Sequence, residues 1–182
     1  MQLARCGSKV HLSGILELDL LEQMAEVGEN TRYLPGVAFP ENLTASADLG
    51  ACLAGARDVL VVVPSHGLRD TLTTIKPLLA EDSRVCWATK GFELHSGKLP
   101  HTVAGEVLGE GRAMAVLSGP TFAKEVAEGL PTAMTIAAND ATFAADLARA
   151  LSSGNFRAYT SDDMIGVEVG GAVKNVLAIA AG

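Results

Sequence analysis

The sequence predicts an α/β fold in which a doubly wound, mainly parallel sheet is covered by helices. Hydrophobic residues make up 48% of the 182 residues and aromatic residues only 4%, so the core must consist of Val, Leu, Ala and Ile. That composition is typical of a parallel sheet buried on both faces. Short aliphatic runs also alternate with segments of helical periodicity, as they do in successive strand–helix units. Nineteen glycines suit the tight turns between such units.

The strands follow from short apolar runs bounded by turn residues. Val59–Val63 is aliphatic without alternation, which predicts a strand buried on both faces. The other runs are shorter but are bounded in the same way. Strands are therefore expected at residues 9–12, 43–45, 58–63, 84–89, 113–117, 132–137 and 156–159.

The helices follow from the three- and four-residue spacing of apolar side chains and from the residues at their ends. Gly7 and Gly28 stand where the first two helices should stop. Pro100 is tolerated because it falls in the first turn of its helix, and two prolines mark residues 30–40 as a loop. Helices are expected at residues 3–6, 17–27, 47–54, 68–79, 98–108 and 140–151, with another opening near Lys124 and the last capped by Asp162 or Asp163.

The composition excludes several classes of function. A net charge of −7 argues against a nucleic-acid-binding surface, which needs a basic face, although a local group of lysines can still bind a small anion. No segment is both long enough and free enough of charge to span a membrane, so no membrane insertion is expected. Cys6, Cys52 and Cys86 are scattered and not spaced as a metal site, which predicts free thiols in a reducing cytoplasm.

The last predicted helix carries a lysine in apolar company. Lys174 is flanked by a repeating set of apolar positions, namely Val173, Val176, Leu177 and Ala180. Burial would lower the pKa of such a lysine and make it usable as a general base or an anion clamp. Alternatively, Lys174 extends to water from the edge of the helix. Gly170 and Gly171 allow another backbone or a ligand to approach closely.

Other polar groups follow the predicted strands. Lys90 comes directly after one strand and the turn Gly119–Thr121 after the next, so both should meet on the side where open α/β sheets bind ligands. The loop Pro64–His66 occupies the corresponding place after an earlier strand. For Lys124 the expected partner is Glu128, four residues along a helix.

These segments together resemble a known family. Five motifs carry the resemblance, in the same order and spacing along nearly the whole chain: Tyr33-Leu34-Pro35, Val61-Val62-Val63-Pro64-Ser65-His66, Trp87-Ala88-Thr89-Lys90-Gly91, Ser118-Gly119-Pro120-Thr121-Phe122-Ala123-Lys124-Glu125 and Gly170-Gly171-Ala172-Val173-Lys174-Asn175. The sequence is similar to the bacterial NAD(P)-dependent glycerol-3-phosphate dehydrogenases. Several long motifs in agreement are far more specific than a lone glycine fingerprint.

The resemblance implies hydride transfer that interconverts dihydroxyacetone phosphate and sn-glycerol 3-phosphate for phospholipid synthesis, with NAD or NADP as cofactor. It implies that Lys174 is the proton acceptor and donor at the reacting oxygen and also contacts the substrate. Charge builds on that oxygen as hydride reaches the carbonyl carbon, and a poised ammonium can neutralise it. The implied substrate-binding residues are Lys90, Gly119, Thr121 and Lys174, and the expected cofactor-binding residues are Lys90, Ala123, Pro64 and Ser65.

The sequence departs from the family pattern at both ends. A Rossmann domain opens with a strand and a Gly-x-Gly-x-x-Gly turn, whereas Met1 falls inside the helix that should follow them. We therefore expect a chain truncated at both ends, with residues 1–161 as an incomplete Rossmann-type domain and residues 162–182 as the first helix of a helical substrate and dimer domain. The missing central strand should leave two exposed sheet edges. On this view the 182 residues alone are inactive, and the full-length protein is a homodimer.

Three alternatives stay open at this point. Ile15 stands where the family usually has a basic or hydrogen-bonding residue, and no acidic ribose ligand is evident, so NAD and NADP are both possible. A related hydroxyacid or ketopantoate type of dehydrogenase also carries a lysine on the helix after its Rossmann domain. A non-catalytic module that pairs with a full-length partner is a further alternative.

Overall fold

The computed structural model describes the backbone of residues 1–181 and the side chains of residues 1–174 and 179–181. Its strands are β1 (Val10–Leu12), β2 (Leu43–Ala45), β3 (Asp58–Val61), β4 (Arg84–Trp87), β5 (Met114–Ser118), β6 (Thr132–Ala138) and β7 (Phe156–Ser161). Its α-helices are α1 (Gln2–Arg5), α2 (Leu18–Val27), α3 (Leu49–Leu53), α4 (Leu68–Ile75), α5 (Pro100–Leu108), α6 (Ala123–Glu128), α7 (Ala141–Leu151) and α8 (Met164–Ala181). Every predicted element is present, with ends shifted by a few residues.

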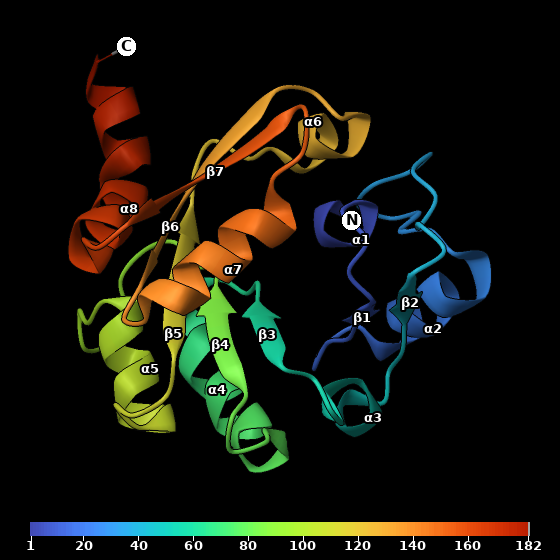
Figure 1. Ribbon diagram of the computed structural model, residues 1–182, viewed down its shortest axis with the longest axis horizontal. Coiled ribbons are helices and arrows are strands. Elements are labelled where there is room, and N and C mark those ends of the chain that lie inside the picture. The colour runs from blue at the N-terminus through green and yellow to red at the C-terminus, as the bar shows by residue number, and fades with distance from the viewer. Residues whose placement is uncertain (182) are drawn as a thin grey trace.

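The main sheet has the order β3-β4-β5-β6-β7 and is covered on both faces. On one face, α4 and α5 pack with Val85, Trp87 and Val116, and apolar residues of α8 join the same cluster. On the other face, Phe143 and Leu147 of α7 pack against the alternate residues of β4, β5 and β6. This alternation along each strand confirms the predicted doubly wound α/β fold (Figure 1).

Two strands, β6 and β7, run opposite to the other three strands of the main sheet. β5 pairs with β6 in antiparallel fashion, with Ser118 opposite Thr135, whereas β3-β4-β5 and β6-β7 are parallel. The short helix α6 lies beyond the end of the sheet instead of crossing one of its faces (Figure 1). Because a parallel connection has to cross back over the sheet, β6 can only return alongside β5 in the opposite sense.

The remaining strands form a separate two-stranded parallel sheet, β1-β2, next to α1 and α2 (Figure 1). Among the described residues, neither β1 nor β3 has a strand partner along its other edge, which fits the expectation of two open edges. The prediction that Val59–Val63 is buried on both faces is wrong, because Leu60 is 37% and Val62 is 69% exposed. Leu60 lies on β3, which is an edge strand of the main sheet, and Val62 follows directly after it, so both side chains remain accessible to solvent.

Capping side chains fix the start of the later helices. The carboxylate of Asp140 accepts a hydrogen bond from the backbone N–H of Phe143 at 2.7 Å and so caps α7. Asp163 accepts in the same way from the N–H of Gly166 at 2.7 Å, which confirms it as the predicted cap of α8. At the far end of α8, Ala180 is exposed instead of buried. The predicted buried positions Val176 and Leu177 and the motif residue Asn175 lie outside the described side chains. The division into domains at residue 161 stays a prediction.

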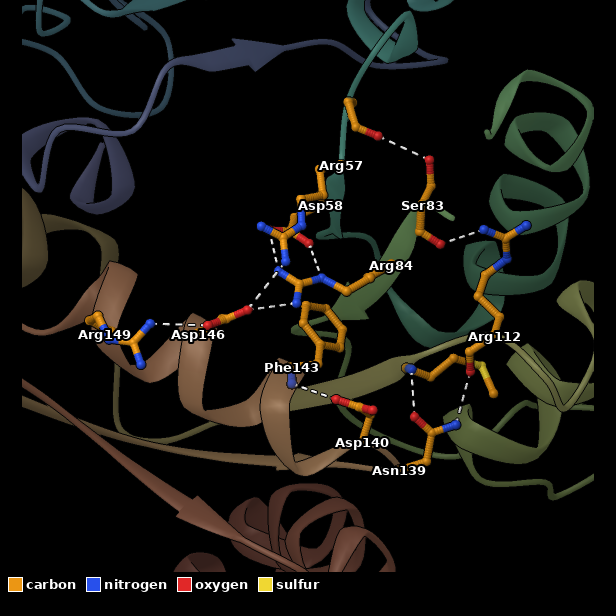
Figure 2. Close-up of polar contacts among 12 residues, drawn as sticks. Arg57, Asp58, Ser83, Arg84, Arg112, Asn139, Asp140, Phe143, Asp146 and Arg149 are labelled. Atoms are coloured by element: carbon orange, nitrogen blue, oxygen red, sulfur yellow. Dashed lines mark hydrogen bonds and ion pairs between the residues drawn. The ribbon is translucent and has the colours of Figure 1, made fainter. Parts of the chain in front are cut away.

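A charge network holds the amino ends of the strands together. The Arg84 guanidinium donates to both carboxylate oxygens of Asp58, at 2.5 and 2.8 Å, and to Asp146 of α7 at 2.8 Å. It also lies 4.4 Å above the centroid of the Phe143 ring, and Arg149 donates to the other oxygen of Asp146 at 3.0 Å. Figure 2 shows Arg84 between the two aspartates and over the ring. No described helix has the length and apolar character needed to cross a membrane.

Candidate functional site

A pocket of about 250 Å³ opens at the carboxyl ends of β4 and β5. Because β4 and β5 are parallel, the segments that follow them emerge on the same side of the sheet. Antiparallel β6 and the glycine-rich part of α8 complete the walls. The lining residues are Lys90, Ser118, Gly119, Pro120, Thr135, Gly166, Val167, Gly170, Gly171 and Lys174.

Lys90 is one of the lining residues of this pocket. Its Nζ donates a hydrogen bond to the carbonyl oxygen of Gly119 at 2.9 Å. Burial lowers the pKa of Lys90, and the positive charge of Lys174 lowers it further. The two ammonium groups are therefore close enough to repel each other, which is an arrangement that an anion would relieve.

Lys174 is exposed, so the structure favours the interpretation in which it extends to water from the helix. Its Nζ lies 5.6 Å from the centroid of the Phe122 ring, within range of a cation–π contact. Among the side chains that the structure describes, no carboxylate forms an ion pair with Lys90 or Lys174. The pocket thus presents two cations that have no carboxylate counter-ion among the described side chains.

Two glycines allow the elements that line the pocket to pack closely against each other. A Cβ on Gly119 would lie 2.6 Å from the carbonyl oxygen of Ala133 on β6, so the neighbouring backbone leaves room only for glycine there. A Cβ on Gly171 would lie 2.9 Å from Ser118 Oγ, so glycine at this position brings α8 against the end of β5. The predicted close approach is therefore found at Gly171, where it is made by side chains and not by a backbone, whereas nothing lies within 4 Å of a Cβ on Gly170.

The comparisons with known proteins identify the family. Residues 1–144 match the family described as NAD-dependent glycerol-3-phosphate dehydrogenase N-terminus. The chain belongs to this family. It is 52% identical over 181 residues to a glycerol-3-phosphate dehydrogenase [NAD(P)+] of Sodalis glossinidius, covering 99% of this chain and 53% of the relative. The chain thus spans about half the length of the curated relatives it matches, and the resemblance inferred from the motifs is confirmed.

Solved structures agree with this assignment. The crystal structure of glycerol-3-phosphate dehydrogenase from Coxiella burnetii is 47% identical, with a TM-score of 0.92 over 98% of this chain and 54% of that one. A ketopantoate reductase from Ralstonia eutropha is 22% identical, with a TM-score of 0.64 over 92% of this chain and 53% of that one. At that identity the second likeness shows only the fold.

The residues that the family motifs single out are not all in the pocket. Lys90, Gly119 and Lys174 line it, whereas Thr121, Ala123, Pro64 and Ser65 do not. The backbone N–H of Thr121 donates to the carbonyl oxygen of Gly119 at 3.0 Å, so that oxygen is shared with Lys90. Ala123 opens α6 next to this turn.

Lys124 lies away from the pocket. Its side chain is 82% exposed, and its Nζ lies 3.8 Å from Glu128 Oε1. The predicted pairing of Lys124 with Glu128 is therefore confirmed. Because this pair is solvent-exposed, it contributes little to the electrostatics of the pocket.

Pro64 and Ser65 lie outside the pocket, beside the loop that carries Gly91. They follow β3, and Gly91 follows the adjacent parallel strand β4, so the two loops lie side by side. A Cβ on Gly91 would lie 3.5 Å from Ser65 Oγ, an ordinary van der Waals distance, so it is the φ of +105° that favours glycine at this position.

Sequence reasoning missed two polar residues of the pocket. Ser118 belongs to a motif that the sequence singled out, and its place as the last residue of β5 was a usable signal. Thr135 carried no such signal, because it reaches the pocket only through the antiparallel pairing of β6 with β5.

Proposed function

We propose that the protein transfers a hydride between NAD(P)H and dihydroxyacetone phosphate to give sn-glycerol 3-phosphate. The observation that carries this proposal is the pocket in which Lys90 and Lys174 face one space with no carboxylate partner among the described side chains. Two such cations suit a substrate that carries a phosphate and develops negative charge on an oxygen. The names of the relatives give the same reaction class.

In this proposal Lys174 is the catalytic residue. Its ammonium gives a proton to the substrate carbonyl oxygen as that carbon is reduced, and its amine takes the proton back in the reverse direction. The exposure of Lys174 keeps the ammonium in exchange with solvent, so it can be reprotonated between turnovers. The nicotinamide, NAD or NADP, supplies and accepts the hydride when it is bound.

The other residues bind and orient. Lys90 contacts both substrate and cofactor, and its bond to the Gly119 carbonyl oxygen fixes the direction of its ammonium. Gly119 and Thr121 bind the substrate through the turn after β5. Ala123, Pro64 and Ser65 contact the cofactor on the side of the pocket next to β3.

Further expectations belong with this proposal. We assign residues 1–161 to a cofactor-binding domain and residues 162–182 to the first helix of a helical substrate domain. The protein acts in the cytoplasm, which its free cysteines support. It acts as a homodimer on a small phosphorylated substrate. Its product serves phospholipid synthesis.

The test is a turnover assay on the protein as its organism produces it. Oxidation of NADH or NADPH should be saturable with dihydroxyacetone phosphate and much slower with ketopantoate, which has no phosphate. The Lys124→Ala variant is the matched control, because it removes an exposed lysine outside the pocket. Faster turnover of ketopantoate would favour the related dehydrogenase type. Absence of cofactor binding would favour the non-catalytic alternative.

A further inference from the structure

A buried carboxylate joins α8 to two other elements. The Glu168 side chain is only 1% exposed. Its Oε1 accepts hydrogen bonds from Trp87 Nε1 on β4 and from the backbone N–H of His101 on α5, both at 3.0 Å. Its Oε2 lies 2.6 Å from Nδ1 of the same histidine. A carboxylate with three partners on two elements is satisfied where it lies.

The bond to the His101 backbone serves the start of α5. His101 is the second residue of that helix, and the N-cap residue, Leu99, forms no capping hydrogen bond with its own side chain. The N–H of His101 is therefore one of the donors that a helix leaves unpaired at its amino end, where negative charge is favoured. Burial raises the pKa of the Glu168 carboxyl, and the hydrogen bonds from His101 and Trp87 oppose this.

The residues of α8 that line the pocket form one stripe. Val167, Gly170, Gly171 and Lys174 recur at three- and four-residue spacing, so they share one face of the helix. Glycines on that face provide no side chains that could interlock with the sheet. The apolar contacts of Met164 and Val167 with the core are not directional, whereas the hydrogen bonds of Glu168 are.

We propose that Glu168 is a positioning residue whose bonds to Trp87 and His101 fix the rotation of α8 and thereby the place of Lys174 in the pocket. This rests on the proposed function of Lys174. A lysine ammonium stands roughly 8 Å from its helix axis, so a rotation of about 10° moves it by roughly 1.4 Å. Misplacement of a catalytic group by about 1 Å can cost a factor of about 100 in rate. Trp87 also lies three residues before Lys90, so the same network holds both lysine-bearing segments.

The first test measures turnover of dihydroxyacetone phosphate by Glu168→Leu and Glu168→Gln. Leucine fills the space without accepting the two N–H groups, so kcat should fall by about 10- to 100-fold while KM changes by less than about 3-fold. Glutamine can accept both N–H groups with its carbonyl oxygen and donate to His101 Nδ1, so it should restore kcat to within about 3-fold of the unmodified protein. Glu128→Leu makes the same change at an exposed carboxylate and should leave kcat unchanged.

The second test does not depend on the reaction. The chain has a single tryptophan, so the indole N–H resonance of Trp87 reports directly on the bond to Glu168. In Glu168→Leu this resonance should shift and exchange faster with solvent, and the resonances of the Gly171 amide and the Lys174 side chain should move with it. In Glu168→Gln these three signals should stay near their positions in the unmodified protein.

The outcomes separate the positioning role from the proposed function. If the unmodified protein reduces no dihydroxyacetone phosphate, the proposed function is wrong. The resonances of Trp87, Gly171 and Lys174 then still test whether Glu168 positions α8. If Glu168→Leu does not fold, His101→Ala takes its place, because it removes the Oε2 partner but keeps the backbone N–H and Trp87. A folded Glu168→Leu or His101→Ala with unshifted Gly171 and Lys174 resonances would overturn the proposal. So would a Glu168→Leu kcat equal to that of the unmodified protein.

Discussion

The two ends of the main sheet differ in whether their positively charged side chains have carboxylate partners. At the amino ends of the strands, Arg84 is held by Asp58 and Asp146, and a second arginine neutralises the other oxygen of Asp146 (Figure 2). At the carboxyl ends, Lys90 and Lys174 face one pocket with no carboxylate in an ion pair among the described side chains. Positively charged side chains are thus paired with carboxylates at the amino ends of the strands. At the carboxyl ends they have no carboxylate partner among the described side chains.

This difference separates a structural role from a functional one. The hydrogen bonds of Arg84 lower the pKa of Asp146, as expected for a pair that stabilises the folded chain. In contrast, burial and the neighbouring Lys174 lower the pKa of Lys90. The charged form of Lys90 is therefore less favourable in the folded protein than in water. In the proposed function, the phosphate of the substrate supplies the missing partner. Substitutions at the amino ends should therefore lower the stability of the protein, whereas substitutions at the carboxyl ends should lower substrate binding and turnover.

The largest effect is expected for Lys174→Ala. Removal of the proton donor should lower kcat by about 100- to 10,000-fold, the range for general acid–base groups, with little change in cofactor affinity. Steady-state turnover of dihydroxyacetone phosphate and a separate cofactor titration measure the two quantities. Lys124→Ala, which removes an exposed lysine outside the pocket, is the control. Unchanged turnover would remove Lys174 from the mechanism.

Lys90→Ala comes next and should act on binding as well as rate. Loss of a charged hydrogen bond to the substrate should raise its KM by roughly 10- to 100-fold. Because its pKa is lowered, Lys90 loses its charge at a lower pH than an ordinary lysine, so substrate affinity should weaken as pH rises through that pKa. A pH series of KM checks both points. An identical series in Lys90→Ala and the unmodified protein would contradict them.

At the amino ends of the strands, substitution of Arg84 should lower the stability of the protein without changing substrate binding. Arg84→Met leaves Asp58 without its arginine and leaves Oδ2 of Asp146 only the 3.4 Å contact with Arg57, which should cost about 2 kcal/mol of unfolding free energy because both aspartates are partly exposed. The midpoint of thermal unfolding should fall by roughly 6 °C. Arg149→Met removes the exposed partner of the same Asp146 and should cost less than about 0.5 kcal/mol. A loss of substrate binding in Arg84→Met would break the contrast between the two ends.

The sequence predicted the parts of this molecule that depend on neighbours along the chain. Apolar spacing located the strands and helices, and the place of Lys90 directly after a strand predicted its position at the pocket. The exposure of Val62 could not be predicted, because it depends on which strand lies beside β3. The direction of β6 depends on where α6 packs, which local pattern does not determine.

The network around Glu168 shows why part of the site stayed hidden. Glu168 bonds to Trp87 and His101, which lie 81 and 67 residues earlier in the chain. In sequence, Glu168 resembles any glutamate on a helix, where the default expectation is exposure to water. Only the packing of α8 over the end of β4 and the start of α5 reveals it as a buried carboxylate.

The smallest expected effect compares two carboxylates whose pKa values are shifted in opposite directions. The pKa of Asp146 is lowered from 3.8 by its arginine partners, so its contribution to stability is present above pH 3.8 and is lost as pH falls through the folded-state pKa. The pKa of Glu168 is raised from 4.5 by burial, so its contribution is present below pH 4.5 and is lost as pH rises through the folded-state pKa.

Urea unfolding of Asp146→Asn and Glu168→Gln over an acid-to-neutral pH series measures both contributions. The stability difference between the unmodified protein and Asp146→Asn should grow as pH rises, because the charged form of Asp146 is the stabilising one. The difference between the unmodified protein and Glu168→Gln should shrink or reverse over the same series. If the stability differences of the two variants change with pH in the same direction, Glu168 is held as a charged carboxylate like Asp146. The contrast between the two ends of the sheet would then not extend to their carboxylates.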